Sequence, residues 1–278
     1  MRIQILADNK KLHKVLEKEH GLCIYVETEN SKCLLDTGAS NKFLQNAASM
    51  EIDITAIDYV FISHGHSDHI GGLPDFLKIN SKAKIVISKN ALTQRFYSNR
   101  NGLKELSSNI NIQDIENRFV FVDSETVFEN EIHVFPCQVC SNPLPKANKT
   151  LLKKIEDEIM ADNFNHELIV CFGRDKMIVY SGCAHCGVLN ILESVKQTIG
   201  KPISMVFGGF HLLDGNEGQY ETEYEIDKLA DELTLHYSET KFYTGHCTGE
   251  NVYKLLKNKL NDKLKQFYTG FTVLISTN

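Results

Sequence analysis

Short apolar runs alternate along the whole chain with segments whose apolar positions recur every three to four residues. Tyr59–Ser63 is a nearly continuous apolar run, which is typical of a strand buried on both faces. This pattern predicts strands at Met1–Ala7, Leu22–Glu27, Lys32–Asp36, Tyr59–Ser63, Lys84–Ser88, Phe119–Asp123, Glu131–Val139, Glu167–Gly173, Lys176–Ser181, Ile203–Phe207, Lys241–Gly245 and Gly270–Ser276. The helical periodicity predicts helices at Ser40–Met50, Gly72–Ile79, Ala91–Ser98, Val188–Thr198, Glu221–His236 and Glu250–Leu260. Strands and helices in alternation indicate an α/β fold.

Two stretches lack a clear pattern. Residues 97–117 and 141–165 are polar and weakly patterned, with strands resuming on both sides of them. We therefore expect residues 1–278 to form a single domain with a lid-like insertion around 97–165. Within it, Lys146–Lys154 carries four lysines and is interpreted as a solvated lid helix.

Composition narrows the classes of partner. The chain is 42% hydrophobic and 24% charged, which suffices for a sizeable core, and its net charge of −6 disfavours nucleic acid or an anionic membrane. No apolar run reaches the roughly 18–20 residues that span a bilayer, so no membrane segment is expected. Asp8 interrupts what would be the apolar part of a signal peptide, which predicts a cytoplasmic protein. Its eight cysteines are then thiols or metal ligands, not disulfides.

The segment 63–69 reads Ser-His-Gly-His-Ser-Asp-His directly after a buried strand. Three imidazoles and a carboxylate within six positions are costly to bring together unless a cation lies between them. His64 and His66 can point toward one ion, and Asp68 and His69 toward a second. These nitrogen and carboxylate ligands suit zinc, manganese or iron better than calcium.

A His-x-His-x-Asp-His motif after a strand resembles that of the metallo-β-lactamase superfamily. The resemblance implies a four-layer αββα sandwich of two packed sheets with outer helices. It also implies two divalent metal ions, zinc first, with manganese, iron or magnesium as alternatives. Upstream, Leu34-Leu35-Asp36-Thr37-Gly38 resembles an element of the superfamily whose aspartate, here Asp36, orients a ligand histidine.

Within the superfamily the chain resembles the group named for dihydropterin-ribofuranosylaminobenzene-phosphate synthase. Five segments carry this resemblance, in the same order as in that group. They are Glu19-His20-Gly21-Leu22, residues 63–73, Ser181-Gly182-Cys183-Ala184-His185-Cys186-Gly187, Gly208-Gly209-Phe210-His211-Leu212 and Gly245-His246-Cys247-Thr248-Gly249. They are specific to the group and not to one substrate.

The resemblance also implies downstream ligands. His246 follows a short strand, where the superfamily supplies its last histidine to the ion held by Asp68 and His69. Cys183 stands where most relatives have an aspartate that bridges both ions. Either the Cys183 thiolate or the His185 imidazole can take this place, and we favour His185 because this group has a histidine there. The missing aspartate leaves open whether one or two ions bind.

Other residues have predicted roles nearer the substrate. Asp68, besides binding metal, is expected to orient the attacking water. His211 is expected to contact a phosphate or to donate a proton to the leaving group. Glu19 and His20 are candidates for lining the cleft. His133 lies inside a predicted strand and is interpreted as a strand side chain, not a ligand.

Cys137 and Cys140 form one Cys-x-x-Cys pair, and Cys183 and Cys186 form another. The 43 positions between Cys140 and Cys183 are too many for a typical zinc ribbon. We therefore expect buried free thiols in place of a separate structural zinc or redox site.

These features predict a metal-dependent hydrolase in which a metal-bound hydroxide attacks a small phosphorylated or ester substrate. The alternative enzyme is a pterin-diphosphate transferase of the synthase type, which would use the same residues. The non-enzyme alternative is a metal-binding sensor or redox partner. Gly65 disfavours it, because di-iron electron-transfer members of the superfamily usually carry an acidic ligand there. The sequence leaves the substrate and the oligomeric state open.

Overall fold

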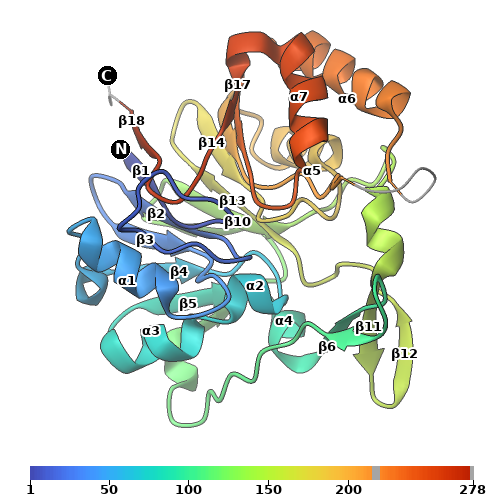
Figure 1. Ribbon diagram of the computed structural model, residues 1–278. Coiled ribbons are helices and arrows are strands. Elements are labelled where there is room, and N and C mark those ends of the chain that lie inside the picture. Colours follow the sequence, from blue (N-terminus) through green and yellow to red (C-terminus); the bar gives the residue numbers. More distant parts are fainter. Residues whose placement is uncertain (215–219, 276–278) are drawn as a thin grey trace.

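The computed structural model describes residues 1–214 and 220–275, in which two seven-stranded sheets pack against each other between helices (Figure 1). The first sheet has the spatial order β18 (Thr272–Leu274), β1 (Arg2–Ala7), β2 (Cys23–Glu27), β3 (Lys32–Leu35), β4 (Tyr59–Phe61), β5 (Lys84–Ile87) and β8 (Phe119–Phe121). The second has the order β17 (Leu264–Gln266), β16 (Lys241–Thr244), β15 (Ile203–Phe207), β14 (Met177–Tyr180), β13 (Leu168–Phe172), β10 (Ile132–Pro136) and β9 (Thr126–Phe128).

Helices cover the outer face of each sheet (Figure 1). The α-helices are α1 (Lys42–Ser49), α2 (Ser67–Ile70), α3 (Leu73–Ile79), α4 (Lys89–Thr93), α5 (Val188–Thr198), α6 (Glu223–His236) and α7 (Glu250–Leu260). Short 3-10 turns occupy Ile54–Ala56, Glu116–Arg118, Lys146–Thr150 and Asn261–Lys263. Buried side chains of α1 and α3 pack on the first sheet, and those of α5, α6 and α7 pack on the second.

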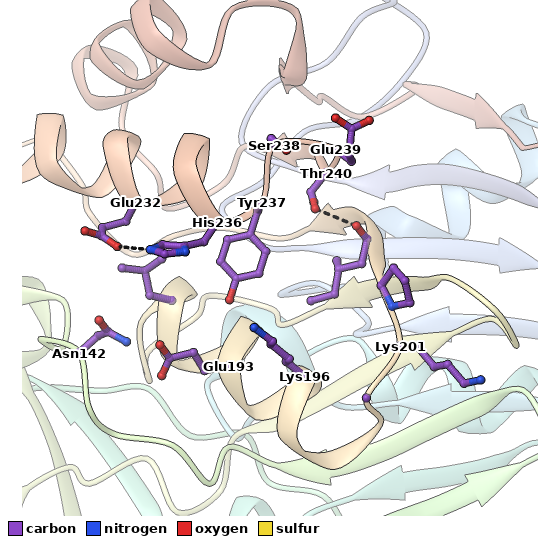
Figure 2. Close-up of a pocket in the computed structure, with 14 residues that line it drawn as sticks. Asn142, Glu193, Lys196, Lys201, Glu232, His236, Tyr237, Ser238, Glu239 and Thr240 are labelled. Atoms are coloured by element: carbon purple, nitrogen blue, oxygen red, sulfur yellow. Dashed lines mark hydrogen bonds and ion pairs between the residues drawn. The ribbon is translucent and has the colours of Figure 1, made fainter.

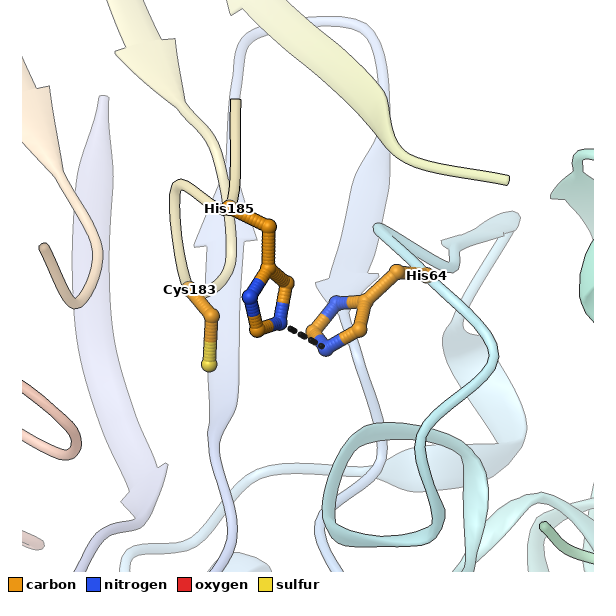
Figure 3. Close-up of side chains that lie close together, drawn as sticks. All are labelled: His64, Cys183 and His185. Carbon is orange, nitrogen blue, oxygen red and sulfur yellow. Dashed lines mark hydrogen bonds between the residues drawn. The ribbon is translucent and has the colours of Figure 1, made fainter. Parts of the chain in front are cut away.

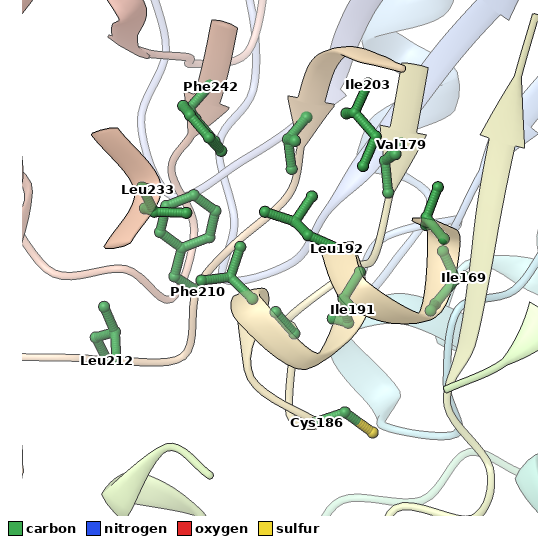
Figure 4. Close-up of a cluster of buried hydrophobic side chains, with 14 of the residues drawn as sticks. Ile169, Val179, Cys186, Ile191, Leu192, Ile203, Phe210, Leu212, Leu233 and Phe242 are labelled. Atoms are coloured by element: carbon green, nitrogen blue, oxygen red, sulfur yellow. The ribbon is translucent and has the colours of Figure 1, made fainter. Parts of the chain in front are cut away.

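Three hydrophobic layers hold the sandwich together. Between the sheets, Phe61 of β4 meets Phe172 of β13 edge-on, with ring centroids 6.2 Å apart. Outside the second sheet, Ile191 and Leu192 of α5 pack with Phe242 of β16 (Figure 4). Burying both faces of each sheet supplies the apolar area that stabilises the fold. The predicted four-layer αββα sandwich is confirmed.

Both sheets are part antiparallel and part parallel. β3, β4, β5 and β8 run parallel in the first sheet, as do β14, β15, β16 and β17 in the second. The chemistry-bearing loops follow the carboxyl ends of β3, β4, β14, β15 and β16. In sheets of this kind, ligands bind outside the carboxyl ends of the strands. This edge of the sandwich is therefore where the site is expected.

A third sheet differs from the predicted local structure. It has the order β12 (Glu158–Ala161), β11 (Leu151–Ile155), β6 (Arg95–Ser98) and β7 (Lys104–Glu105). The predicted helix Ala91–Ser98 is wrong, because α4 ends at Thr93 and β6 follows. In β6 the buried Phe96 stands between the less buried Arg95 and Tyr97, which is the alternation of a strand and not of a helix.

The predicted lid helix at Lys146–Lys154 is also wrong. A 3-10 turn ends at Thr150, and β11 then pairs with both β6 and β12. Leu151 and Lys153 point to the buried face, and the ammonium of Lys153 donates to the Asn163 side chain there. The range 97–165 does not lie in the third sheet alone, because β8 belongs to the first main sheet and β9 and β10 belong to the second.

The other predicted elements agree with the structure to within a few residues, although the strands β9, β12 and β17 and the short β7 had no predicted counterpart. The end of the predicted strand Gly270–Ser276 lies outside the described residues. Among the helices of residues 1–214 and 220–275, none has the length and apolar character that crossing a membrane requires.

Candidate metal centre

Loops from both sheets meet at one edge of the sandwich. Residues 63–69 follow β4, and Ser63 lies against Gly182 from the loop after β14, where an added Cβ would overlap the Ser63 side chain. Glycine is needed at that position both for this approach and for its φ of +56°. The loop after β16 brings His246 to the same place, with Nε2 3.2 Å from that of His69. The structure thus gathers the histidines predicted from distant motifs.

Asp36 holds the residues of this site together through hydrogen bonds. Its side chain is fully buried, and Oδ1 accepts the backbone N–H of Ser63 at 2.7 Å. Oδ2 accepts from Ser63 Oγ at 2.6 Å, His69 Nδ1 at 2.5 Å and the Tyr180 hydroxyl at 2.5 Å. Because Nδ1 of His69 donates to Asp36, Nε2 of that ring carries the free lone pair. Asp36 thus holds the His69 ring by the nitrogen opposite its free lone pair.

One group of ligand atoms gathers around His64 and His185. Their Nε2 atoms lie 3.3 Å apart, facing each other (Figure 3). His64 Nδ1 donates to Ser63 Oγ, which itself donates to Asp36, and His185 Nδ1 donates to the Asn148 amide oxygen. Both Nε2 atoms therefore present lone pairs, and neither can donate to the other. A cation between them satisfies both.

The ring of His66 adjoins the same group. Its centroid lies 4.7 Å from that of His64 and 5.0 Å from that of His185. Burial, with the neighbouring imidazoles, lowers the pKa of both His64 and His185 well below the ordinary value. The two rings are consequently neutral at pH 7, which is the form that binds metal. We call His64, His66 and His185 the first ligand set.

A second ligand set consists of Asp68, His69 and His246. His246 Nε2 lies 3.2 Å from both His69 Nε2 and Asp68 Oδ2. Burial opposes ionisation of Asp68, but the surrounding His69 and His246 lower its pKa well below the ordinary value. Burial likewise opposes a charged His246, yet the hydrogen bond to Asp68 and the nearby Cys247 raise its pKa to about 9. This position thus demands positive charge, which either a proton or a metal ion supplies.

Cys183 lies between the two ligand sets. Its thiol sulfur is 3.1 Å from His69 Nε2, and it groups within 4.8 Å both with His69 and His246 and with His64 and His185. His185, the residue favoured from sequence for the bridging place, groups only with the first set among these clusters. The two residues therefore take different places, and Cys183 has the one common to both sets.

Asp162 and His166 were missed by the sequence analysis. His166 accepts the backbone N–H of Gly65 through Nδ1 at 3.1 Å and donates from Nε2 to Asp162 at 3.0 Å. Asp162 Oδ2 also lies 3.8 Å from His66 Nε2. Burial opposes ionisation of Asp162, but its hydrogen bond to His166 and the nearby His66 ring outweigh burial and lower its pKa, so it stays ionised. This buried carboxylate thus lies beside Nε2 of His66 without a direct hydrogen bond to it.

Glu167 was also missed. It is buried, and its two carboxylate oxygens accept the backbone N–H groups of His185 at 2.7 Å and Cys186 at 2.8 Å. These bonds fix the loop that carries His185. Burial raises the pKa of Glu167 to about 7 despite them. Its place as the first residue of the predicted strand Glu167–Gly173 was the available signal.

Glu19 and His20 separate into two roles. Glu19 accepts from the backbone N–H groups of Ala39 and Ser40, which fixes the loop after Asp36. His20 is exposed, stacks on His246 with centroids 5.0 Å apart, and has Nε2 3.4 Å from Asp68 Oδ2. His20 thus borders the second ligand set where it meets solvent.

His211 and His133 lie in different places. His211 is only 6% exposed, and its ring centroid is 4.3 Å from that of His185. His133 projects from β10 and pairs with Glu125 at 2.8 Å, away from both ligand sets.

A cavity of about 600 Å³ elsewhere does not coincide with this chemistry. It lies between the C-terminal ends of α5 and α6, where Lys196, His236 and Tyr237 line it (Figure 2). None of the residues of the two ligand sets borders it. The side-chain cluster, and not this cavity, identifies the candidate site.

Comparison with known proteins agrees with this geometry. Residues 17–137 match the family model described as the Metallo-beta-lactamase superfamily. A solved protein described as a metal-dependent hydrolase of the beta-lactamase superfamily superposes with a TM-score of 0.82 at 28% identity, over the whole of both chains. A solved diphosphatase of the PhnP family, at 13% identity and TM-score 0.55 over 99% of this chain and 98% of that one, shares the fold.

One relative bears the name predicted for the group. The chain is 24% identical to the 7,8-dihydropterin-6-methyl-4-(beta-D-ribofuranosyl)-aminobenzene-5'-phosphate synthase of Methanocaldococcus jannaschii, over 95% of this chain and 96% of the relative. The chain therefore has the metallo-β-lactamase fold and is similar, over most of its length, to a metal-dependent hydrolase and to this synthase. Its predicted resemblance to the superfamily, and within it to the synthase-named group, is confirmed.

Proposed function

We propose that the protein is a metal-dependent hydrolase that uses two divalent cations on a small phosphorylated or ester substrate. The observation that carries this proposal is the pair of Nε2 lone pairs of His64 and His185, which face each other at 3.3 Å. Buried acceptors that point at one another are unfavourable unless a cation lies between them. A second pair of ring nitrogens, Nε2 of His69 and Nε2 of His246, lies 3.2 Å apart beside the Asp68 carboxylate, where positive charge is favoured.

The residues fit two cations. The first ligand set offers three imidazoles, and the second offers Asp68 with two imidazoles. Nitrogen and carboxylate donors of this kind suit zinc first, with manganese and iron as alternatives. We assign Cys183 to both cations, because its sulfur groups with each set. This replaces the aspartate bridge of most relatives with a thiolate and makes His185 a ligand of the first cation.

Divalent cations in such a site lower the pKa of water toward neutrality and offset negative charge on the substrate. The protein residues do the remaining work. Asp36 fixes the orientation of His69, and the Asp162 carboxylate lies 3.8 Å from Nε2 of His66. Asp68, with 19% of its side chain exposed, can accept a hydrogen bond from the attacking water. His20 stands at the solvent side of Asp68 and can give a proton to the leaving group.

The synthase reaction is the second candidate, and the relative that is similar over 95% of this chain favours it. It would join a dihydropterin diphosphate to an aminobenzene ribofuranosyl phosphate through the same residues. The two candidates differ in the nucleophile, which is water in the first and the aromatic partner in the second.

Chromogenic esters test the hydrolase proposal. Zinc- or manganese-loaded protein is incubated with p-nitrophenyl phosphate, bis-p-nitrophenyl phosphate and p-nitrophenyl acetate. The wild type and His133→Ala, whose histidine lies outside the site, should release p-nitrophenol at equal rates, and His69→Ala should be nearly inactive. Equal rates for His69→Ala and wild type would overturn the assignment of the site. Metal-loaded protein that hydrolyses none of these esters but joins the two synthase substrates would favour the second candidate.

A further inference from the structure

A third group of ligand atoms lies beside the second ligand set. Cys183 Sγ, Cys247 Sγ and one ring nitrogen of His211 lie within 4.8 Å of one another. They come from the loops after β14, β16 and β15, respectively. Each of the three residues is at least nine-tenths buried. Neither ligand set uses Cys247 or His211.

The His211 ring is the member of this group that lacks partners. Both of its ring nitrogens are buried without a hydrogen-bond partner in the part of the chain that the structure describes. The Cys247 thiol donates a long hydrogen bond to the Cys183 carbonyl oxygen, at 3.8 Å. An imidazole buried in this way loses its bonds to water and receives nothing in return. The two His211 nitrogens are therefore free to bind an ion beside the two thiols.

The backbone holds the three residues in place. Gly209 N–H donates to the Gly182 carbonyl at 2.7 Å, and Phe210 N–H donates to Thr248 Oγ1 at 3.0 Å. A Cβ at Gly209 would overlap the Cys247 sulfur, so only glycine allows this approach. His211 itself has a φ of +48°, an uncommon conformation for a side chain of its size. The loops thus fix the His211 ring in its position beside the two thiols.

We propose that Cys183, Cys247 and His211 form a third cation site, specific for a thiophilic ion such as Zn²⁺ or Fe²⁺. Two thiolates and an imidazole are a known protein ligand set for such ions and leave a fourth position open. On binding, the ion displaces the Cys247 thiol proton, which passes to solvent, and the Cys183 proton as well where no catalytic cation has already displaced it. The Cys183 thiolate is then common to this ion and the two catalytic cations, which links all three into one cluster.

Cobalt titration of reduced, metal-free protein tests this inference. Co²⁺ reports sulfur ligation through near-ultraviolet charge-transfer absorption, and elemental analysis counts the bound ions. The variant is Cys247→Ala, and the matched control is Cys171→Ala, which removes a buried thiol from the hydrophobic core. We expect wild type and Cys171→Ala to bind about one equivalent more than Cys247→Ala. Part of the charge-transfer absorption should persist in Cys247→Ala, because Cys183 remains.

Equal stoichiometry and equal absorption in Cys247→Ala and wild type would overturn the third site. The test compares the number of ions bound by wild type with the number bound by Cys247→Ala. If the proposed two-cation centre were wrong, both numbers would be lower by the same amount, and the difference that reports the third site would remain. His211→Asn is the second variant, because asparagine tolerates a positive φ. It should lose the same equivalent, and retention of that ion in folded His211→Asn would also contradict the proposal.

Discussion

Replacing Asp36 by asparagine should weaken metal binding without unfolding the protein. Asp36 has a φ of +58°, which asparagine also tolerates, so the backbone can stay unchanged. The amide, however, has one acceptor where the carboxylate has two. Whichever way it turns, its NH₂ group faces a donor, either Ser63 N–H or the three donors that now bond Oδ2. The bond that fixes Nδ1 of His69 is then lost or weakened.

The size of the effect follows from these contacts. A hydrogen bond to a charged group contributes about 1.5–3 kcal/mol. Loss of a residue that orients a metal-binding histidine typically lowers metal affinity about 10–100-fold. That range equals about 1.4–2.7 kcal/mol, which agrees with the loss of one such bond. Tyr180→Phe should have a smaller effect, because Asp36 keeps its bonds to Ser63 and His69.

Competition with a chromophoric zinc chelator measures this affinity. Wild type, Asp36→Asn, Tyr180→Phe and the control Asp53→Asn are compared, with circular dichroism as the test of folding. Asp53 is a surface residue that bonds only the Thr55 side chain and nearby backbone, so its variant should bind zinc as wild type does. Folded Asp36→Asn with wild-type affinity would refute the argument that Asp36 orients His69.

Three further substitutions test the supporting structure. Glu167→Gln should lower the free energy of unfolding by about 1–3 kcal/mol in urea titrations, because an amide accepts from only one of the His185 and Cys186 N–H groups. Since burial raises the pKa of Glu167 to about 7, this residue contributes a fall in stability as pH rises from its ordinary pKa to about 7, and the fall should be smaller in the variant, which lacks that contribution. Gly65→Ala should lower the Tm clearly, because its Cβ would overlap the Phe96 ring and lie 2.8 Å from the Ala91 carbonyl; an unchanged Tm would contradict the close packing. Thr222→Ala should cost about 1 kcal/mol through the capping box of α6 yet leave zinc affinity unchanged, and a change in affinity would contradict the separation of that helix end from the site.

The alternation of apolar strands and helices predicted an α/β fold, and the sandwich was predicted through the family that the His-x-His-x-Asp-His motif resembles. Leu168–Phe172 and Met177–Tyr180 are apolar strands in which every residue is buried, so their pattern was visible in the sequence. The third sheet was not predictable on the same basis. All four residues of β12 are exposed, and β7 has two residues, so neither shows the alternation of apolar and polar positions that marks a half-buried strand. β12 forms by pairing with β11, and β7 forms by pairing with β6. Pairing between distant segments cannot be recognised from the hydrophobicity of the segments themselves.

Some residues of the candidate site could likewise be predicted from the sequence, and others could not. His64, His66, Asp68 and His69 are contiguous, so their clustering is visible in the sequence itself. Asp162 reaches His66 from a segment that sequence alone describes only as polar. The place of Cys183 relative to His185 depends on the path of one loop, with Ala184 at a φ of +55° between them. Neither composition nor spacing determines such a backbone turn.

Anomalous diffraction from zinc-loaded crystals tests the central claim most directly. The account predicts one peak among His64, His66 and His185 and a second among Asp68, His69 and His246, besides the peak proposed separately at Cys247 and His211. The first two should lie within bonding distance of Cys183 Sγ, about 2.3 Å for zinc and sulfur. Zinc peaks at other places, with the His64 and His185 nitrogens left facing each other without an ion, would contradict the two-cation site.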